Sequence, residues 1–240
     1  MPARPASLSD LPHVWRGREL APAEEAVVPT GHAALDAHLP GRGWPLGSLV
    51  EVLQAEAQQH VWQLLGPGLA AATARGDPAV LVHPPYQPFG PCLRAQGIAP
   101  ERLLCVHAEK MAARLWAAEQ ALRCADVGAV LAWIPQARAE ELRRLHLCAQ
   151  AGQKLLVLFR PLHARDHSSP ARLRLAVQGT EKLEVRILKR RGPPLLEPLV
   201  LRAQPQMLAS LLASRQQRRA PVPLETPGSH VLDRPATHPA

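Results

Sequence analysis

The stretch VEVLQAEAQQHVWQLL, residues 50–65, decides the fold expected for this 240-residue chain. It begins with an apolar run typical of a buried strand and continues with the apolar spacing of a helix. Many nucleotide-binding proteins place a glycine-rich phosphate loop at such a junction. Here the junction contains neither glycine nor lysine. The segment therefore predicts the frame of a nucleotide site without its phosphate-binding chemistry.

Outside this segment, short apolar runs alternate with helical patterns, which predicts a largely parallel sheet covered by helices. The five expected core strands are SLVEVL (48–53), AVLVH (79–83), RLLCVH (102–107), VGAVLAW (127–133) and KLLVLF (154–159). Helical spacing predicts one crossover helix from Met111 to Arg123 and another through Leu142 and Ala149. In the helix that follows the first strand, Pro67 lacks an N–H and should break or kink the helix.

The pattern changes after residue 160. Residues 171–178 and 182–191 alternate apolar and charged side chains around a Gly-Thr turn, which predicts an antiparallel hairpin, and residues 197–203 predict a further short strand. The expected fold class is thus α/β, with a mostly parallel sheet flanked by helices and an antiparallel C-terminal extension. We expect a flexible N-terminal arm over residues 1–29, one domain over 30–203, and a short helix with a disordered Pro/Arg-rich tail over 204–240.

The overall composition limits the kinds of partner, site and location that we expect for the protein. The formal net charge of +8 suits an anionic partner such as nucleic acid, although many ordinary basic proteins look alike. The four cysteines are far apart and form no CxxC pair, so neither a zinc site nor a disulfide framework is indicated. No signal segment and no run of 18 uncharged apolar residues occurs, which predicts a cytoplasmic protein without a membrane span.

Two segments carry a resemblance to a known family. TGHAALDAHLPGRGWPLGSLVEVL (30–53) resembles the approach to the ATPase core of RecA-type recombinases, and LEVRILKRRGPPLLEPLVL (183–201) is similar to its closing strands. More specifically, VWRG, PTGHAALDAHLPGRGWPLG, LWAAEQALR, GAVLAW and LKRRG occur in the order typical of the ImuA family, RecA-like accessory proteins of bacterial mutagenic translesion synthesis. The resemblance spans about residues 28–203 and implies a degenerate RecA-like core with the P-loop NTPase fold.

At the positions that the resemblance assigns to nucleotide chemistry, the required residue types are missing. Gln54 and Gln59 stand where phosphate-loop glycines are expected, His60 where the lysine is expected, and Val61 where the magnesium-binding hydroxyl is expected. Trp133 stands where a carboxylate should orient magnesium. The segment after the second core strand also lacks a catalytic carboxylate. We therefore expect no ATP hydrolysis, no catalytic residue and no cofactor.

Three polar residues, His83, His107 and Arg160, stand at the ends of expected strands. Ligands of open α/β sheets gather at the carboxyl ends of strands, so these side chains either mark a residual cleft or simply cap the strands, which is the commoner role. The spacing of histidines predicts no metal site, and no Ser/His/Asp arrangement predicts a nucleophile.

Two basic runs are candidates for contacts with nucleic acid or a protein partner, and a solvated surface explains them equally well. Neither run contains aromatic residues for stacking on single strands. They comprise Arg186, Lys189, Arg190 and Arg191 in the expected domain, and Arg215, Arg218 and Arg219 in the tail.

The resemblance implies a non-catalytic adaptor in SOS-inducible mutagenic translesion DNA synthesis. Its expected partners are an ImuB-type inactive Y-family polymerase homologue and an error-prone DnaE-type polymerase, with RecA and DNA as further contacts. Such a protein would associate with the nucleoid on DNA damage. Two alternatives stay open: a SulA-like inhibitor of cell division in the SOS response, which shares the degenerate core, and an ATPase with an unorthodox phosphate loop.

Overall fold

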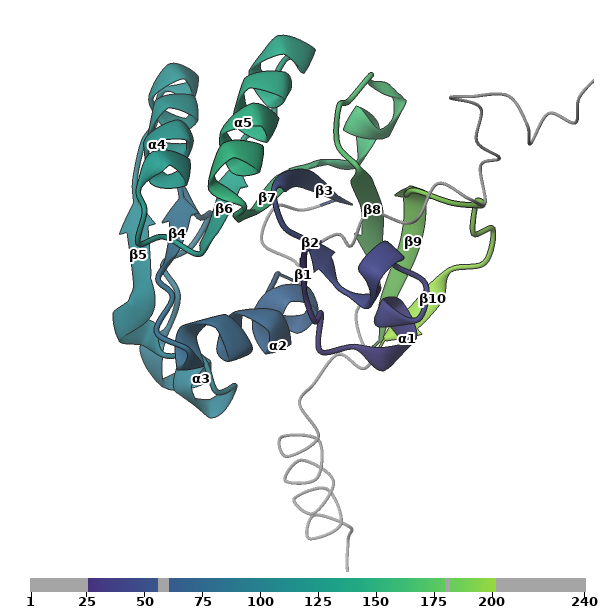
Figure 1. Cartoon of the computed structure of the whole chain (residues 1–240), viewed down its shortest axis with the longest axis horizontal. Coiled ribbons are helices and arrows are strands. Elements are labelled where there is room, and N and C mark those ends of the chain that lie inside the picture. The colour runs from purple at the N-terminus through teal and green to yellow at the C-terminus, as the bar shows by residue number, and fades with distance from the viewer. Residues whose placement is uncertain (1–25, 56–60, 180–181, 202–240) are drawn as a thin grey trace, which may run out of the picture. The chain divides into compact units, whose positions relative to one another are not determined.

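The computed structural model describes residues 26–55, 61–179 and 182–201, and an eight-stranded sheet forms the centre of this part (Figure 1). In chain order its strands are β3 (Ser48–Gln54), β4 (Ala79–Val82), β5 (Leu103–Val106), β6 (Ala129–Trp133), β7 (Leu155–Pro161), β8 (Leu173–Gln178), β9 (Leu183–Lys189) and β10 (Leu199–Leu201). Across the sheet the order is β10-β9-β8-β3-β7-β6-β4-β5. Strands β3 to β8 are parallel, whereas β9 and β10 are antiparallel to their neighbours. The predicted mixed sheet with an antiparallel extension is confirmed.

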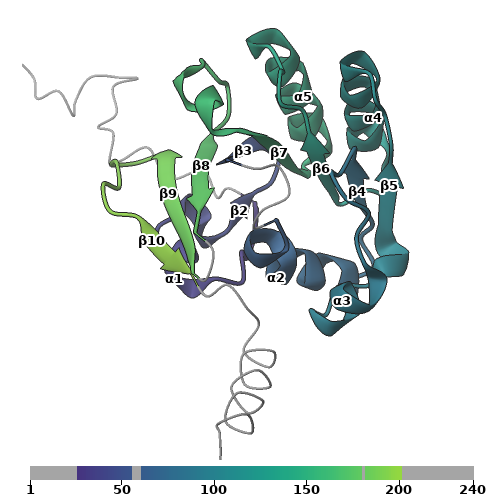
Figure 2. The same cartoon turned by 180° about the vertical axis from the view of Figure 1, so that it is seen from behind.

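Helices cover both faces of this sheet (Figures 1 and 2). In the described part they are α1 (Ala33–Asp36), α2 (Val61–Ala74), α3 (Gly90–Ala95), α4 (Met111–Arg123) and α5 (Ala139–Gly152), with short 3₁₀ turns at Pro40–Arg42, Pro100–Arg102 and Leu162–Asp166. Helices α4 and α5 pack side by side on one face, and α2 packs on the other. A separate pair of short strands, β1 (Val27–Val28) and β2 (Trp44–Pro45), includes residues assigned above to the N-terminal arm.

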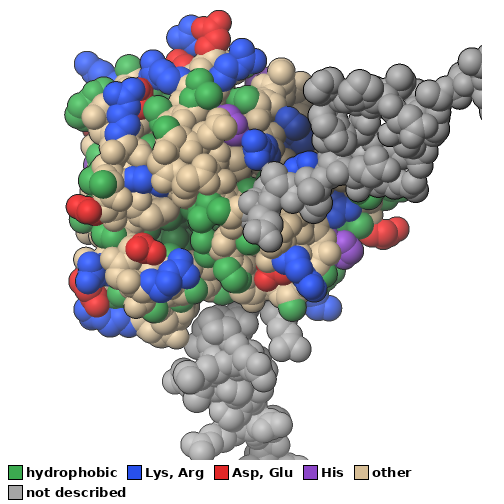
Figure 3. Space-filling view, in the orientation of Figure 1, with side chains coloured by type: hydrophobic (Ala, Val, Ile, Leu, Met, Phe, Trp, Pro, Cys, Tyr) green, Lys and Arg blue, Asp and Glu red, His purple; other side chains and the backbone are tan. Residues whose placement is uncertain are grey.

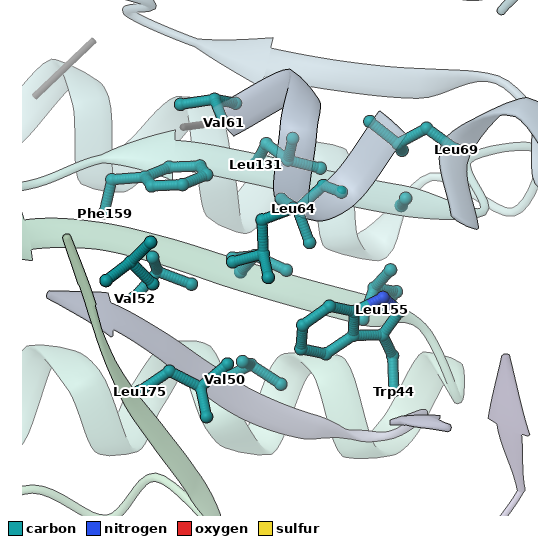
Figure 4. Packing of buried hydrophobic residues seen from close by; sticks show 14 of the residues in the cluster. Trp44, Val50, Val52, Val61, Leu64, Leu69, Leu131, Leu155, Phe159 and Leu175 are labelled. Atoms are coloured by element: carbon teal, nitrogen blue, oxygen red, sulfur yellow. The ribbon is translucent and has the colours of Figure 1, made fainter. Parts of the chain in front are cut away.

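Strand β3 is buried along its whole length because β7 and β8 flank it and helices cover both of its faces. Side chains alternate across a strand, so neighbouring residues enter different cores. Val50 and Val52 pack with Leu64 of α2 in one core (Figure 4), whereas Leu49 packs with the helices of the opposite face. Burial on both faces thus explains why the strand at the start of the segment is apolar except for Glu51.

Strand β5 differs from its prediction as a core strand. It lies at the edge of the sheet and pairs only with β4 among the described strands. Leu104 is 52% exposed, and Cys105 and Val106 are also exposed. An apolar run predicts a strand, but it does not say whether another strand will cover its second edge.

Pro67 does not break α2, which continues from Val61 to Ala74. A proline at this position cannot donate to the carbonyl four residues earlier, that of Gln63. His32 compensates from outside the helix: its Nε2 lies 3.0 Å from the Gln63 carbonyl oxygen and 3.2 Å from that of Leu64. Gly31 allows this close approach, since a Cβ added there would lie 2.2 Å from the Pro67 Cβ. Of the predicted break or kink, the break does not occur, because a tertiary contact supplies a donor that the sequence neighbours cannot.

The turn that carries His32 is held by its own polar residues. The Thr30 N–H donates to Asp36 Oδ1 at 3.0 Å, and the His32 N–H donates to Thr30 Oγ1 at 3.0 Å. Leu35 between them is fully buried. The T-G-x-x-x-L-D segment thus anchors the chain at the start of the domain and supports α2.

Candidate functional site

The positions expected to hold a phosphate loop lie between β3 and α2. Gln54 is the last residue of β3 and is 1% exposed. Val61 is the first residue of α2, and its side chain packs in the core beneath that helix. Gln59 and His60 lie outside the described residues. Because Val61 is an apolar core residue, the start of α2 supports packing and offers no ligand for magnesium.

The position expected to orient magnesium is also occupied by an apolar contact. Trp133 ends β6 and pairs with Phe159 of β7 in the register of the sheet. Their rings stack with centroids 4.5 Å apart and planes 18° from parallel. A ring in this stack supplies none of the negative charge that a metal ion and a triphosphate require.

A cavity of about 280 Å³ opens beside this stack. It lies at the carboxyl ends of β3, β4, β6 and β7, where ligands of open α/β sheets bind. Its lining is mainly apolar, and none of the described residues that line it is acidic. Its polar groups come from Gln54, His83, Arg114 and Arg160.

His83 lies at the rim of this cavity, directly after β4, in a left-handed backbone conformation with φ 51°. Arg114 of α4 places Nη2 2.6 Å from His83 Nε2 and donates from Nε to the Ala108 carbonyl at 2.8 Å. A guanidinium only donates, so His83 Nε2 accepts and the imidazole is neutral. Burial lowers the pKa of His83, and the charges of Arg114 and His107 lower it further. The pair therefore brings one fixed cation and one neutral imidazole to the rim.

Arg160 reaches the cavity from the end of β7 and belongs to a buried ionic cluster. Its Nη1 donates to Glu51 Oε1 at 2.7 Å, and Arg174 Nε donates to Glu51 Oε2 at 2.6 Å. Arg160 Nη2 also donates to the Ala137 carbonyl, and Arg174 donates to the carbonyls of Ala164 and Arg165. One carboxylate thus joins two guanidinium groups, so the cluster carries a net positive charge beside the cavity.

The structure brings together two of the three strand-end residues singled out in the sequence. His83 and Arg160 line the same cavity, whereas His107 is exposed and is absent from its lining. Arg114 was missed because it lies on a helix, where a single arginine between apolar residues carries no distinguishing pattern. Only the placement of α4 beside the end of β4 shows that Arg114 faces His83.

The basic residues predicted as partner contacts have different surroundings. Arg186 is exposed on β9, whereas the Lys189 Nζ donates to the Ser169 carbonyl at 2.9 Å. Arg190 donates to the carbonyls of Pro193 and His38, which ties it to the domain. Arg191 lines a small hollow together with Arg190 and with Arg172, a residue that the sequence analysis did not single out. Arg215, Arg218 and Arg219 lie outside the described residues.

On the face shown in Figure 3, Lys and Arg side chains are spread widely, with Asp and Glu among them, instead of forming one continuous patch. Arg172 and Lys189 both lie near His146 of α5, whose pKa is lowered by burial and then by these two charges. His146 Nδ1 accepts a hydrogen bond from the Leu49 N–H at 3.0 Å. This histidine is therefore part of the structure, as a neutral acceptor.

Comparison with known proteins gives one relationship. No protein-family model matches the chain. The chain is 27% identical over 140 residues to the cell division inhibitor SulA of Edwardsiella piscicida, and the match covers 58% of this chain and 83% of that protein. This similarity supports an SOS-related relationship of the RecA/SulA type and does not single out the ImuA family. Within the described residues, no helix has the length and apolar character needed to cross a membrane.

Proposed function

We propose that the protein is a non-catalytic adaptor in SOS-inducible mutagenic translesion DNA synthesis. The observation that carries this proposal is the stack of Trp133 on Phe159 at the position where ATP chemistry needs a carboxylate. Metal positioning and charge stabilisation supply most of the catalysis of phosphoryl transfer. A site that offers an aromatic stack and an apolar Val61 in their place is suited to association and not to hydrolysis.

The proposed partners are an ImuB-type inactive Y-family polymerase homologue and an error-prone DnaE-type polymerase. The support for them is the ordered set of motifs described above, from PTGHAALDAHLPGRGWPLG to LKRRG. The similarity to SulA adds support for the SOS context. In this proposal the domain presents surfaces that hold polymerase components together, and exposed cations such as Arg186 keep the assembly close to DNA.

Co-purification with the ImuB-type protein tests the adaptor role. We expect capture by the full-length chain, and a version ending at residue 203 tells whether the last 37 residues contribute. Failure of both versions to capture the partner would overturn the proposal. A parallel assay with magnesium and ATP addresses the catalytic alternative: micromolar binding with turnover abolished by His60→Ala would establish an unorthodox ATPase.

A second candidate function is inhibition of cell division. The observation that favours it is the similarity to a cell division inhibitor over 83% of that protein's length. Two readouts separate it from the adaptor role. A division inhibitor should cause filamentous growth when overproduced without DNA damage and should capture a tubulin-like division protein. An adaptor should do neither and should instead capture polymerase components.

A further inference from the structure

Two residues that line the cavity at the carboxyl ends of the strands carry buried donors that the described part of the protein leaves unmatched. His83 Nε2 accepts from Arg114, so the proton of the neutral ring resides on Nδ1. This Nδ1 is buried and has no hydrogen-bond partner among the described residues. The imidazole therefore presents an N–H group whose acceptor has to come from elsewhere.

Arg160 presents a second such group. Its side chain is 2% exposed, and its Nη1 and Nη2 are engaged by Glu51 and the Ala137 carbonyl. Its Nε is buried and has no partner among the described residues. Buried N–H groups without acceptors are rare in folded proteins because their desolvation is uncompensated. Both residues line one cavity, so an acceptor bound there is the partner that these N–H groups could gain when the side chains adjust to a ligand.

Charge and shape narrow the chemistry of that acceptor. Arg114 and Arg160 are cationic, and no described residue in the lining is acidic, which favours an anionic oxygen. The Trp133–Phe159 stack and Pro135 offer a flat apolar wall. A volume of about 280 Å³ lies just below the range of roughly 300–1,000 Å³ typical of sites for drug-sized ligands. The cavity suits a single ring or branched side chain with one carboxylate.

We infer that this cavity binds an apolar carboxylate, with the carboxylate oxygens toward His83 and Arg160 and the apolar group against Trp133. The same chemistry has two sources, the C-terminal residue of a polypeptide and a free small aromatic acid. A triphosphate is a poor match because the cavity is small and the described residues that line it include neither glycine nor a carboxylate. This inference does not depend on the adaptor role.

Calorimetric titration of the full-length protein tests the inference with three probes. They are a five-residue peptide ending in phenylalanine with a free carboxylate, the same peptide as a C-terminal amide, and 3-phenylpropanoate. We expect the free-carboxylate peptide to bind about tenfold or more tightly than the amide. Equal binding of 3-phenylpropanoate and the acid peptide would identify a small acid as the sufficient ligand, whereas much tighter peptide binding would identify a chain terminus. Absence of binding by all three probes would overturn the inference.

Two variants locate the binding. Ala55 is exposed and lines the cavity, so Ala55→Trp should obstruct it without disturbing the core and weaken binding by about tenfold or more. Ala74→Trp places the same side chain at an exposed position at the end of α2 and should leave affinity unchanged. Arg114→Gln should weaken binding of the free-carboxylate peptide and leave binding of the amide peptide unchanged. Retained affinity in Ala55→Trp, or equal losses for acid and amide in Arg114→Gln, would refute the assignment.

The same variants separate this inference from the proposed function. If Ala55→Trp abolishes probe binding but the ImuB-type partner still co-purifies, the cavity is a ligand site distinct from the adaptor surface. If the wild-type protein binds the probes but captures no polymerase component, the adaptor role fails while the cavity assignment stands.

Discussion

Replacing Glu51 with glutamine should cost the domain a large part of its stability. The Glu51 carboxylate is fully buried and accepts from two guanidinium groups at 2.7 and 2.6 Å, and these arginine side chains are only 2% and 9% exposed. Glutamine keeps the shape of the side chain but removes the charge that compensates both arginines. Breaking a buried ion pair by changing one partner costs about 3–5 kcal/mol. Two charge-assisted hydrogen bonds at about 1.5–3 kcal/mol each give a similar value.

The chain contains a matched control for this substitution. Glu119 also pairs with two arginines: it accepts from Arg123 at 2.6 Å and forms an ion pair with Arg144 at 3.1 Å, but those arginine side chains are 62% and 56% exposed. Water can solvate the arginines when this carboxylate is lost, so Glu119→Gln should cost about 1 kcal/mol or less. The two variants remove the same chemical group and differ in the burial of the partners.

Urea unfolding, monitored by circular dichroism, measures both variants. With a slope of about 2 kcal/mol per molar urea, Glu51→Gln should lower the midpoint by about 2 M and Glu119→Gln by about 0.5 M or less. A triple variant, Glu51→Leu with Arg160→Met and Arg174→Met, should be less destabilised than Glu51→Gln because no charge is left buried and uncompensated. Equal midpoints for Glu51→Gln and Glu119→Gln would refute the reasoning from burial.

Three further predictions follow from the contacts described above. His32→Ala should destabilise the wild-type protein by about 1 kcal/mol more than it destabilises Pro67→Ala, because the N–H of the introduced alanine can replace the histidine as donor to the Gln63 carbonyl. A double-mutant cycle that shows no coupling between the two positions would contradict this. Because the pKa of His146 is lowered in the folded state, its contribution to stability is present above its usual value near 6.5 and is lost as pH falls through the lowered folded pKa. Between pH 7 and pH 5 the free energy of unfolding should therefore fall less in His146→Asn than in the wild-type protein, and asparagine keeps an acceptor for the Leu49 N–H. An equal fall in both proteins would exclude His146 as the source of the pH dependence. If the domain contacts DNA phosphates, Arg186→Ala should reduce the slope of the logarithm of the DNA-binding constant against log salt by about 0.7–0.9. Arg190→Ala should chiefly reduce the stability of the domain, because Arg190 donates to two backbone carbonyls. Identical effects of the two variants would argue against phosphate contact by Arg186.

The strands of the sheet could be predicted from the sequence because each strand has a local pattern of apolar and polar residues. The mainly apolar run at 48–53 and the alternation at 171–178 each predict a strand. The alternation does not predict how many faces of β8 are buried, because Arg174 on its polar face is buried as well. The edge position of β5 was not predictable in this way, since pairing partners are set by distant strands. Pro67 shows a second limit: local rules predict a break, and the contact from His32 that preserves the helix comes from 35 positions earlier in the chain.

Only the position shared by His83 and Arg160 could be expected from the sequence. His83 directly follows β4 and Arg160 lies near the end of β7, and the carboxyl ends of parallel strands meet at one edge of a sheet, so their common cavity follows from the fold. The stack of Trp133 on Phe159 required knowledge that β6 and β7 are neighbours in a particular register. The resemblance indicated only that this position carries no carboxylate, and the structure shows the aromatic contact that Trp133 makes there.

These contacts explain how the strand-to-helix frame is held without phosphate-binding chemistry. Val61 is part of the core beneath α2, Trp133 is part of an aromatic stack, and Arg160 is paired with Glu51, so each now has a partner within the protein. The strand-to-helix junction is retained because β3 and α2 bury one another, independently of any ligand. Groups that have acquired structural partners resist reversal by a single substitution, since restoring a ligand to the site also removes packing or leaves a buried charge unmatched. The cavity beside them is small, and its described lining is mainly apolar with the cationic side chains of Arg114 and Arg160.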